Sequence, residues 1–238
     1  MKQRIILAVC SASLVVGCAT NDAKRVYQRE MASQGLIPYN PPQGNPTGAY
    51  DWYQYGPGII VRPADGRNVT TANTLIGEQG VNRAKERITY YGLFSGKRYS
   101  KNSIDLTGSL AAAGGAVKAA EATLNAEGIR ASEIEFLNPR ISKPYSISYM
   151  RNRLKAAWSH LDEPTIKELN SGKAVVAHDV IIADGLRFHF NKSTSGSVSG
   201  DVTLTTAQKL ALAAKGISTF DGGIDVKQPC FVAFRKLD

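Results

Sequence analysis

AVVAHDVIIADGLRFHF, residues 174–190, is the strongest β-strand signal in this chain. Its first part, Val175 to Ile182, is almost entirely apolar, which indicates a strand buried on both faces. Its last part, Leu186 to Phe190, alternates apolar and polar side chains, which indicates a strand with one buried face. Asp184-Gly185 between the two parts is a two-residue hairpin signal. We therefore expect two neighbouring strands, the first nearly all buried and the second half buried.

Shorter signals on both sides of this pair mix helices with strands. Apolar residues at spacings of three and four predict an amphipathic helix through Ile147, Met150, Leu154, Trp158 and Leu161. Asp162-Glu163-Pro164 predicts the start of another short helix, which Gly172 ends. Other helices are expected at 71–87, 110–127 and 206–215, and other strands at 58–62, 88–94, 132–137 and 230–237. Because helices and strands do not alternate strictly, we expect an α+β fold with a mainly antiparallel sheet and several short helices.

The chain begins with a short basic segment followed by an apolar run. Lys2 and Arg4 precede Ile5 to Val16, which is shorter than the roughly 20 residues that a permanent membrane helix needs. The run ends in Leu14-Val15-Val16-Gly17-Cys18. This segment resembles the lipobox of bacterial type II signal peptides, with Val15 where that motif usually has leucine.

The resemblance implies that residues 1–17 are a cleaved lipoprotein signal peptide and that Cys18 is the lipidated first residue of the mature protein. Diacylglycerol on the Cys18 sulfur and acylation of the new amine would hold the protein at a lipid bilayer. In enterobacteria, a lipoprotein that has Asp directly after the lipidated cysteine is retained in the inner membrane. Ala19 therefore implies the outer membrane, facing the periplasm or the cell surface. The alternative is an ordinary secretory signal that is cut at a small residue such as Ala19.

Residues 18–48 are predicted to be a lipidated tether. The segment from Pro38 to Pro46 carries four prolines and little apolar surface, which favours an extended, polyproline-like spacer. We expect residues 49–238 to form a single folded domain, and deletion of residues 36–47 to leave its thermal transition almost unchanged.

The charge and the cysteines limit the partners and the redox chemistry. The formal net charge is +9, and in the envelope no nucleic acid is within reach. The basic residues Arg151, Arg153 and Lys155 lie on the predicted helix, as a solvated face or as contacts to an anionic membrane surface. With Cys18 lipidated and Cys10 removed, Cys230 remains alone, without an intramolecular disulfide. Its apolar neighbours predict a buried, inert thiol.

No motif with catalytic or metal-binding spacing was found, so we expect no catalytic residue, no metal site and no cofactor. His178 and His189 flank the expected hairpin turn and could face each other or lie on opposite faces. Because the HxH, HExxH and CxxC spacings are missing, we interpret them as surface or satisfied core histidines. His160 stands apart from both. Gly92 to Arg98 lacks one residue of a P-loop and has arginine where Ser or Thr binds magnesium, so it is interpreted as a turn.

Two functional hypotheses follow. The first is a non-catalytic, membrane-anchored envelope lipoprotein that binds a protein partner or has a structural role in an envelope assembly. The second is a membrane-active protein. From Ser103 onward the order of elements resembles the pore-forming half of gasdermins: strand, small-residue stretch, strand, helical segment, long apolar strands through Val175 to Phe190, a Ser/Gly loop and a terminal strand. The resemblance implies pore formation.

Overall fold

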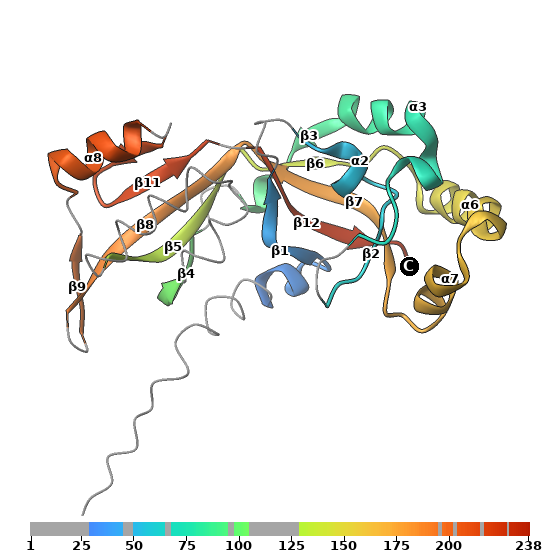
Figure 1. The fold of residues 1–238 in the computed structure, drawn as a ribbon, viewed down its shortest axis with the longest axis horizontal. Helices are drawn as coiled ribbons and strands as arrows, with labels where there is room; N and C mark the ends of the chain where they lie inside the picture. Colours follow the sequence, from blue (N-terminus) through green and yellow to red (C-terminus); the bar gives the residue numbers. More distant parts are fainter. Residues whose placement is uncertain are drawn as a thin grey trace, which may run out of the picture.

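The computed structural model describes residues 29–44, 50–64, 68–94, 98–104, 129–194, 197–201, 204–214, 217–227 and 229–238. These residues form antiparallel sheets and several short helices, which confirms the α+β class (Figure 1). The predicted signal peptide at residues 1–17, Cys18 and the helix expected at 110–127 lie outside the described residues.

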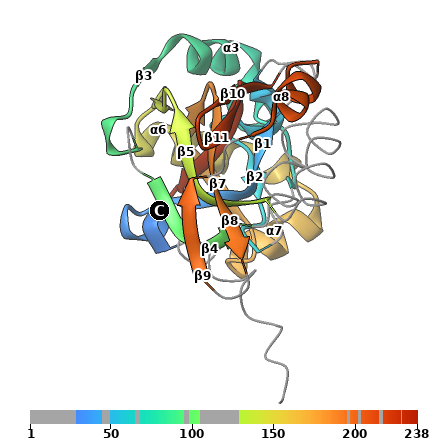
Figure 2. The same ribbon diagram turned by 90° about the vertical axis from the view of Figure 1, so that its left-hand side faces the viewer.

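The strands form two six-stranded antiparallel sheets. The first sheet has the order β1-β12-β7-β6-β3, and β2 also pairs with β7. Its strands are β1 Ile37–Gly44, β2 Ile60–Val61, β3 Ile88–Tyr90, β6 Arg140–Ser142, β7 Val175–Ala183 and β12 Cys230–Lys236. The second sheet has the order β10-β11-β8-β5-β4, and β9 also pairs with β8. Its strands are β4 Arg98–Ile104, β5 Ile129–Leu137, β8 Gly185–Thr194, β9 Ser197–Asp201, β10 Ser218–Phe220 and β11 Gly223–Val226. Figure 2 looks onto the end of the molecule that carries this second sheet.

Three chain segments run from one sheet directly into the other. β5 leads into β6, β7 into β8 and β11 into β12, and the order of neighbours is the same on both sides, β12-β7-β6 and β11-β8-β5. Figure 1 shows β7 and β8 as one long ribbon that bends between the sheets. The two sheets are therefore two halves of one twisted, bent antiparallel ribbon.

The hairpin expected at Asp184-Gly185 is not formed. β7 pairs with β12, β6 and β2, whereas β8 pairs with β11, β5 and β9, so the two strands are not neighbours. Asp184 lies at the bend instead, where its carboxylate accepts hydrogen bonds from Asn138 Nδ2 (2.7 Å) and Tyr50 Oη (3.1 Å) and pairs with Arg140. Gly185 is required there because a Cβ would collide with the carbonyl oxygen of Val226.

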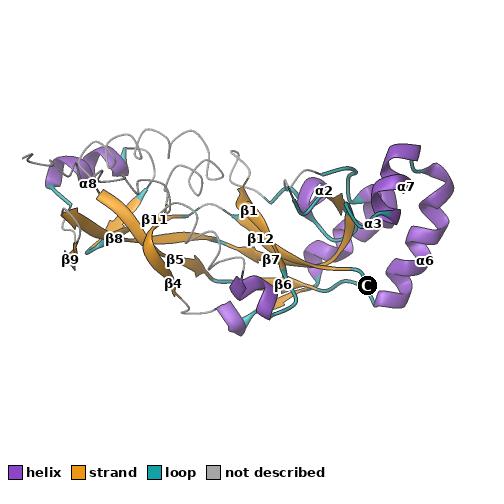
Figure 3. Cartoon of the chain, turned by 90° about the horizontal axis from the view of Figure 1, so that it is seen from below, coloured by secondary structure: helices purple, strands orange, loops and turns teal. Residues whose placement is uncertain are grey.

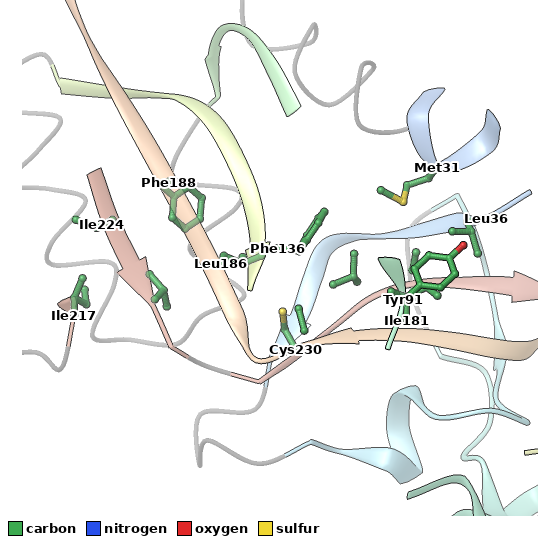
Figure 4. Packing of buried hydrophobic residues seen from close by; sticks show 14 of the residues in the cluster. Met31, Leu36, Tyr91, Phe136, Ile181, Leu186, Phe188, Ile217, Ile224 and Cys230 are labelled. Carbon is green, nitrogen blue, oxygen red and sulfur yellow. The ribbon is translucent and has the colours of Figure 1, made fainter. Parts of the chain in front are cut away.

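The burial expected for these two strands is confirmed. Every residue of β7 after Val175 is buried. In the part of β8 from Leu186 to Phe190, the three apolar residues are buried, and Arg187 and His189 between them are half-buried. The hydrophobic core has two clusters: one runs from the second sheet onto β6, β7 and β12 of the first sheet, and the other joins the first sheet to α2 (Trp52–Tyr55) and α3 (Asn73–Glu86). Figure 4 shows part of the first cluster, in which Phe188 and Leu186 of β8 lie near Phe136 of β5.

Most helices cover one end of the molecule. Figure 3 shows α3 (Asn73–Glu86), α6 (Ile147–Ala157) and α7 (Glu163–Asn170) near α2 (Trp52–Tyr55), with α8 (Thr206–Ala213) at the opposite end. The amphipathic helix predicted from Ile147 is α6, which continues as a 3-10 turn, Trp158–His160. Asp162 caps α7 by accepting a hydrogen bond from the Thr165 backbone N–H (2.7 Å). The predicted start of α7 is therefore confirmed.

The tether differs from the prediction, because its last part packs on the domain. A helical turn at 29–33 ends at Gly35, whose φ is +68°, and Leu36 N–H bonds back to the Met31 carbonyl (2.9 Å). β1 then pairs with β12, and Met31, Leu36 and Tyr39 are buried. Proline has no backbone N–H group, but an edge strand pairs on one side only and can therefore contain prolines. Among the described residues, packing is therefore already present at Met31 and does not begin near Tyr50.

None of the helices in the described part of the chain is both long and apolar enough to span a membrane.

Candidate binding site: the groove between α3 and α6

A groove of about 520 Å³ lies between helices α3 and α6. Its lining comes from the α3 residues Ile76 to Arg83, from Tyr145, and from Tyr149 and Arg153 of α6. The volume falls within the range of small-ligand sites in proteins, roughly 300–1,000 Å³. The groove is thus large enough for a small ligand or a short stretch of peptide.

Two glycines of α3 shape the groove. Gly77 has non-helical dihedral angles (φ +68°, ψ 173°) and breaks the helix. Gly80 has no side chain where a Cβ would lie 2.9 Å from the Tyr145 hydroxyl oxygen and 2.6 Å from Ile76 Cβ. Gly80 therefore lets the Tyr145 ring approach the α3 backbone. The helix expected at 71–87 is therefore present but broken at Gly77.

An aromatic stack forms one wall of the groove. The rings of Tyr145 and Tyr149 are nearly parallel, with centroids 4.4 Å apart and an angle of 14° between their planes. The Arg83 guanidinium carbon lies 5.3 Å from the centroid of the Tyr145 ring, in the range of a cation–π contact. Tyr149 remains 40 % exposed. The stack therefore offers a partly open aromatic ring beside fixed positive charge.

Arginines dominate the charge of the groove. Arg153 Nε donates a hydrogen bond to the Leu75 carbonyl oxygen (2.7 Å), which fixes the side chain against the broken part of α3. Burial raises the pKa of the Tyr145 hydroxyl and Tyr149 adds to this, whereas the nearby charges of Arg83, Arg153 and Arg87 act in the opposite direction. Arg83 and Arg153 thus line the groove, the charge of Arg87 also acts on Tyr145, and Glu78 is the acidic residue in the lining.

A buried polar chain supports the groove from behind. His178 Nε2 lies 3.0 Å from the Tyr145 carbonyl oxygen, which can only accept, so Nε2 donates. The other ring nitrogen, Nδ1, lies 2.8 Å from Asp179, and the second Asp179 oxygen accepts from Arg235 (2.8 Å). His178 is thus held inside the protein as a structural group, and its ring does not present a free base to the groove.

The other histidines do not join His178. His189 lies on β8 in the second sheet, with Nε2 3.5 Å from a Glu135 oxygen and its ring against Phe220. His160 is exposed at the end of the 3-10 turn. The hypothesis that His178 and His189 face each other is wrong because their strands are not neighbours. Among the residues that the structure describes, no group of three or more His, Cys, Asp or Glu residues could hold a metal ion.

The predicted basic cluster is divided between two places. Arg153 faces α3, whereas Arg151 Nε donates to the Asp238 backbone oxygen (2.7 Å). Cys230 is buried as expected, and burial raises the pKa of its thiol to about 12, with Asp184 contributing. Of the P-loop-like segment, Gly92–Phe94 is a 3-10 turn and Arg98 begins β4. Cys18 lies outside the described residues.

Sequence reasoning missed the aromatic stack. Tyr145 and Tyr149 stand four residues apart, on either side of the start of the predicted helix. Two aromatic residues beside a helix start were a usable signal for the pair. Arg83 could not have been added to it, because it lies on α3 and Tyr145 lies in the loop before α6, far away in the sequence.

No protein-family model matches the chain, and no curated protein matches it. Among solved structures, the chain is similar to a bacterial gasdermin from Bradyrhizobium tropiciagri, with a TM-score of 0.34 and 12 % sequence identity over 88 % of this chain and 84 % of that chain. At this TM-score the likeness assigns neither fold nor function, which rest on the residues described above.

Proposed function

We propose that the protein is a membrane-anchored envelope lipoprotein with a non-catalytic role, in which the folded domain binds another envelope protein. The anchor is the lipid on Cys18, and the place is the outer membrane on its periplasmic side. The lipobox-like segment at residues 14–18 supports the anchor. The groove between α3 and α6 supports the binding role, because it combines a partly exposed aromatic stack with arginines in one concave site.

Crosslinking in the native envelope tests this proposal. A photo-reactive residue replaces Gln79, which is exposed and lines the groove, or Asp221, which is exposed at the turn of the second sheet. We expect a defined protein adduct from position 79 that is lost when Arg83→Gln is added, and no such adduct from position 221. Equal adducts from both positions, or adducts that do not depend on Arg83, would contradict a binding role for the groove.

The order of elements favours a second candidate, a membrane-active protein. β5, α6, β7, β8 and β12 follow one another as the resemblance to gasdermins requires, although β7 and β8 do not form a hairpin. Dye release from liposomes separates the two candidates. A binding lipoprotein leaves the liposomes intact, whereas release that rises with protein concentration would support the second candidate and contradict the first.

A further inference from the structure

We propose that the groove between α3 and α6 recognises an acidic peptide segment that carries an aromatic side chain. This inference rests on the proposed function in taking a protein as the partner. It goes further by naming the chemistry of the segment: carboxylates that pair with the arginines, and a ring that stacks on Tyr149.

In the described part of the chain, the groove has positive charge that is not paired with carboxylates. Arg83, Arg87 and Arg153 are exposed, and in the described ranges none of the three has a carboxylate within ion-pair distance. Elsewhere in the described structure, arginines are paired with acids: Arg62 with Glu168, Arg187 with Asp225, and Arg235 with Asp179. The groove therefore holds positive charge that the domain does not neutralise, and planar guanidinium groups match carboxylates best.

The aromatic stack has one end that a ligand can contact. Tyr145 is covered on its ring by Arg83 and by Tyr149, so the end of the stack is Tyr149. Its exposed part lies in the groove wall beside Arg153. An aromatic side chain of a ligand can extend this stack at centroid distances of about 4.5–7 Å. A ligand with charged groups but no aromatic ring would make no stacking contact with Tyr149.

The geometry favours a peptide over a lipid surface. Proteins bind an anionic membrane surface through basic side chains that project toward the lipid headgroups. Here Arg153 is hydrogen-bonded to the Leu75 carbonyl and Arg83 is held over the Tyr145 ring, so both lie in the walls of a concave site.

Fluorescence anisotropy on the detergent-solubilised full-length protein provides the test. The probe is the labelled hexapeptide Glu-Tyr-Glu-Glu-Tyr-Glu, and the matched peptides replace every Glu by Gln or every Tyr by Ala. We expect the acidic aromatic peptide to bind most tightly, and raising the salt concentration from about 0.05 M to 0.5 M to weaken its binding by shortening the screening length. Equal affinity for all three peptides would overturn the proposal.

Variants place the binding in the groove. Arg83→Gln should reduce the affinity for the probe about tenfold, because one hydrogen-bonded charge is lost. Arg151→Gln removes the same charge from the same end of the molecule but outside the groove, and should change the affinity less than about twofold. Arg87→Gln, which removes a charge that acts on Tyr145 from outside the groove lining, serves as a second variant if Arg83→Gln melts at a lower temperature. Equal effects at positions 83, 87 and 151 would overturn the assignment to the groove.

Competition distinguishes the sources of negative charge. Glycerophosphorylglycerol, the soluble headgroup of an anionic phospholipid, should displace the probe only weakly compared with unlabelled peptide. Displacement by this headgroup at lower concentration than the peptide would overturn the choice of a peptide. Because the assay needs neither the lipid on Cys18 nor an envelope partner, peptide binding with a failed anchor refutes the lipoprotein proposal alone. A confirmed anchor without peptide binding refutes the groove inference alone.

Discussion

Gly80 lies next to Tyr145 in the groove wall, and the shape of the site depends on Gly80 having no side chain. A Cβ at this position would lie 2.6 Å from Ile76 Cβ and 2.9 Å from the Tyr145 hydroxyl oxygen. Since Ile76 is buried and branched at that atom, it cannot easily move away. The stack of Tyr145 and Tyr149 therefore exists in its present place because α3 carries glycine there.

We accordingly predict that Gly80→Ala lowers the free energy of unfolding by about 1–3 kcal/mol, the usual cost of overpacking. It should also weaken binding of the acidic peptide, because the Tyr145 ring must move. Urea melts and anisotropy measure the two effects. Gly92→Ala is the control: its Cβ would meet only the Tyr90 ring at 3.4 Å, so the stability should change little. Unchanged stability and binding in Gly80→Ala would show that the groove can adapt.

At the scale of elements, β1 shows that the beginning of the chain contributes to the core. Tyr39 is fully buried, its hydroxyl donates to the Tyr55 carbonyl (3.0 Å), and its ring packs against Phe234 with centroids 5.0 Å apart. These contacts argue against the expectation that deleting residues 36–47 leaves the stability unchanged. β1 holds the edge of the first sheet next to β12.

Tyr39→Ala is predicted to destabilise the protein by about 3–5 kcal/mol, as large-to-small changes of buried aromatic residues do. Tyr90→Ala in β3 should stay within about 0.5 kcal/mol, because that ring is 61 % exposed. Denaturant melts of the two variants give both numbers under the same conditions. A small effect at Tyr39 would restore the idea of a spacer that does not pack on the domain.

The bend between the two sheets is the second feature at this scale. Asp184 accepts hydrogen bonds from Asn138 and Tyr50 and pairs with Arg140, and the Tyr50 hydroxyl also donates to the Ala183 carbonyl (2.9 Å). These contacts join the β5–β6 and β7–β8 segments at the point where both segments pass from one sheet to the other. Burial raises the pKa of the Tyr50 hydroxyl well above its ordinary value, so it remains a hydrogen-bond donor at all ordinary pH values.

A double-mutant cycle measures how strongly this bend is fixed. Asp184→Ala combined with Arg140→Ala should show a coupling energy of roughly 0.5–2 kcal/mol, since both side chains are still partly exposed to solvent. The control pairs Asp184→Ala with Arg62→Ala, which lies near β2 at the far end of β7 and should be additive. Additivity in both cycles would mean that the bend is set by backbone pairing alone.

The sequence was informative about burial and less so about pairing. The apolar run Val175 to Ile182 and the alternation from Leu186 to Phe190 correctly predicted which residues are buried, because burial depends on local pattern. The hairpin at Asp184-Gly185 failed because each strand found its neighbours among distant segments, β12 and β6 for β7, and β11 and β5 for β8. The groove was missed for the same reason, since Arg83 lies on α3 and Tyr145 lies in the loop before α6, far away in the sequence.

At the scale of the whole molecule, the packing of the segment from Met31 to Tyr39 changes the distance to the proposed anchor. If Cys18 carries the lipid, only residues 19–28 separate it from the described domain. At about 3.3–3.6 Å per residue, this linker spans at most roughly 40 Å when fully extended. The domain would then lie close to the membrane that holds it. A partner of the groove would have to be reached near that surface.

The anchor itself gives the last prediction. Cys18→Ser should abolish retention in the membrane fraction and leave an uncleaved or soluble precursor, because the serine hydroxyl cannot receive diacylglycerol in place of the thiol. Cys230→Ala is the matched control, since that cysteine is buried in the domain and should leave retention unchanged. Cells grown with labelled fatty acid and then fractionated report both lipidation and location. Label incorporated equally into the Cys18→Ser protein would show that the lipid is attached elsewhere. Retention without label would show that something other than a lipid holds the domain at the membrane.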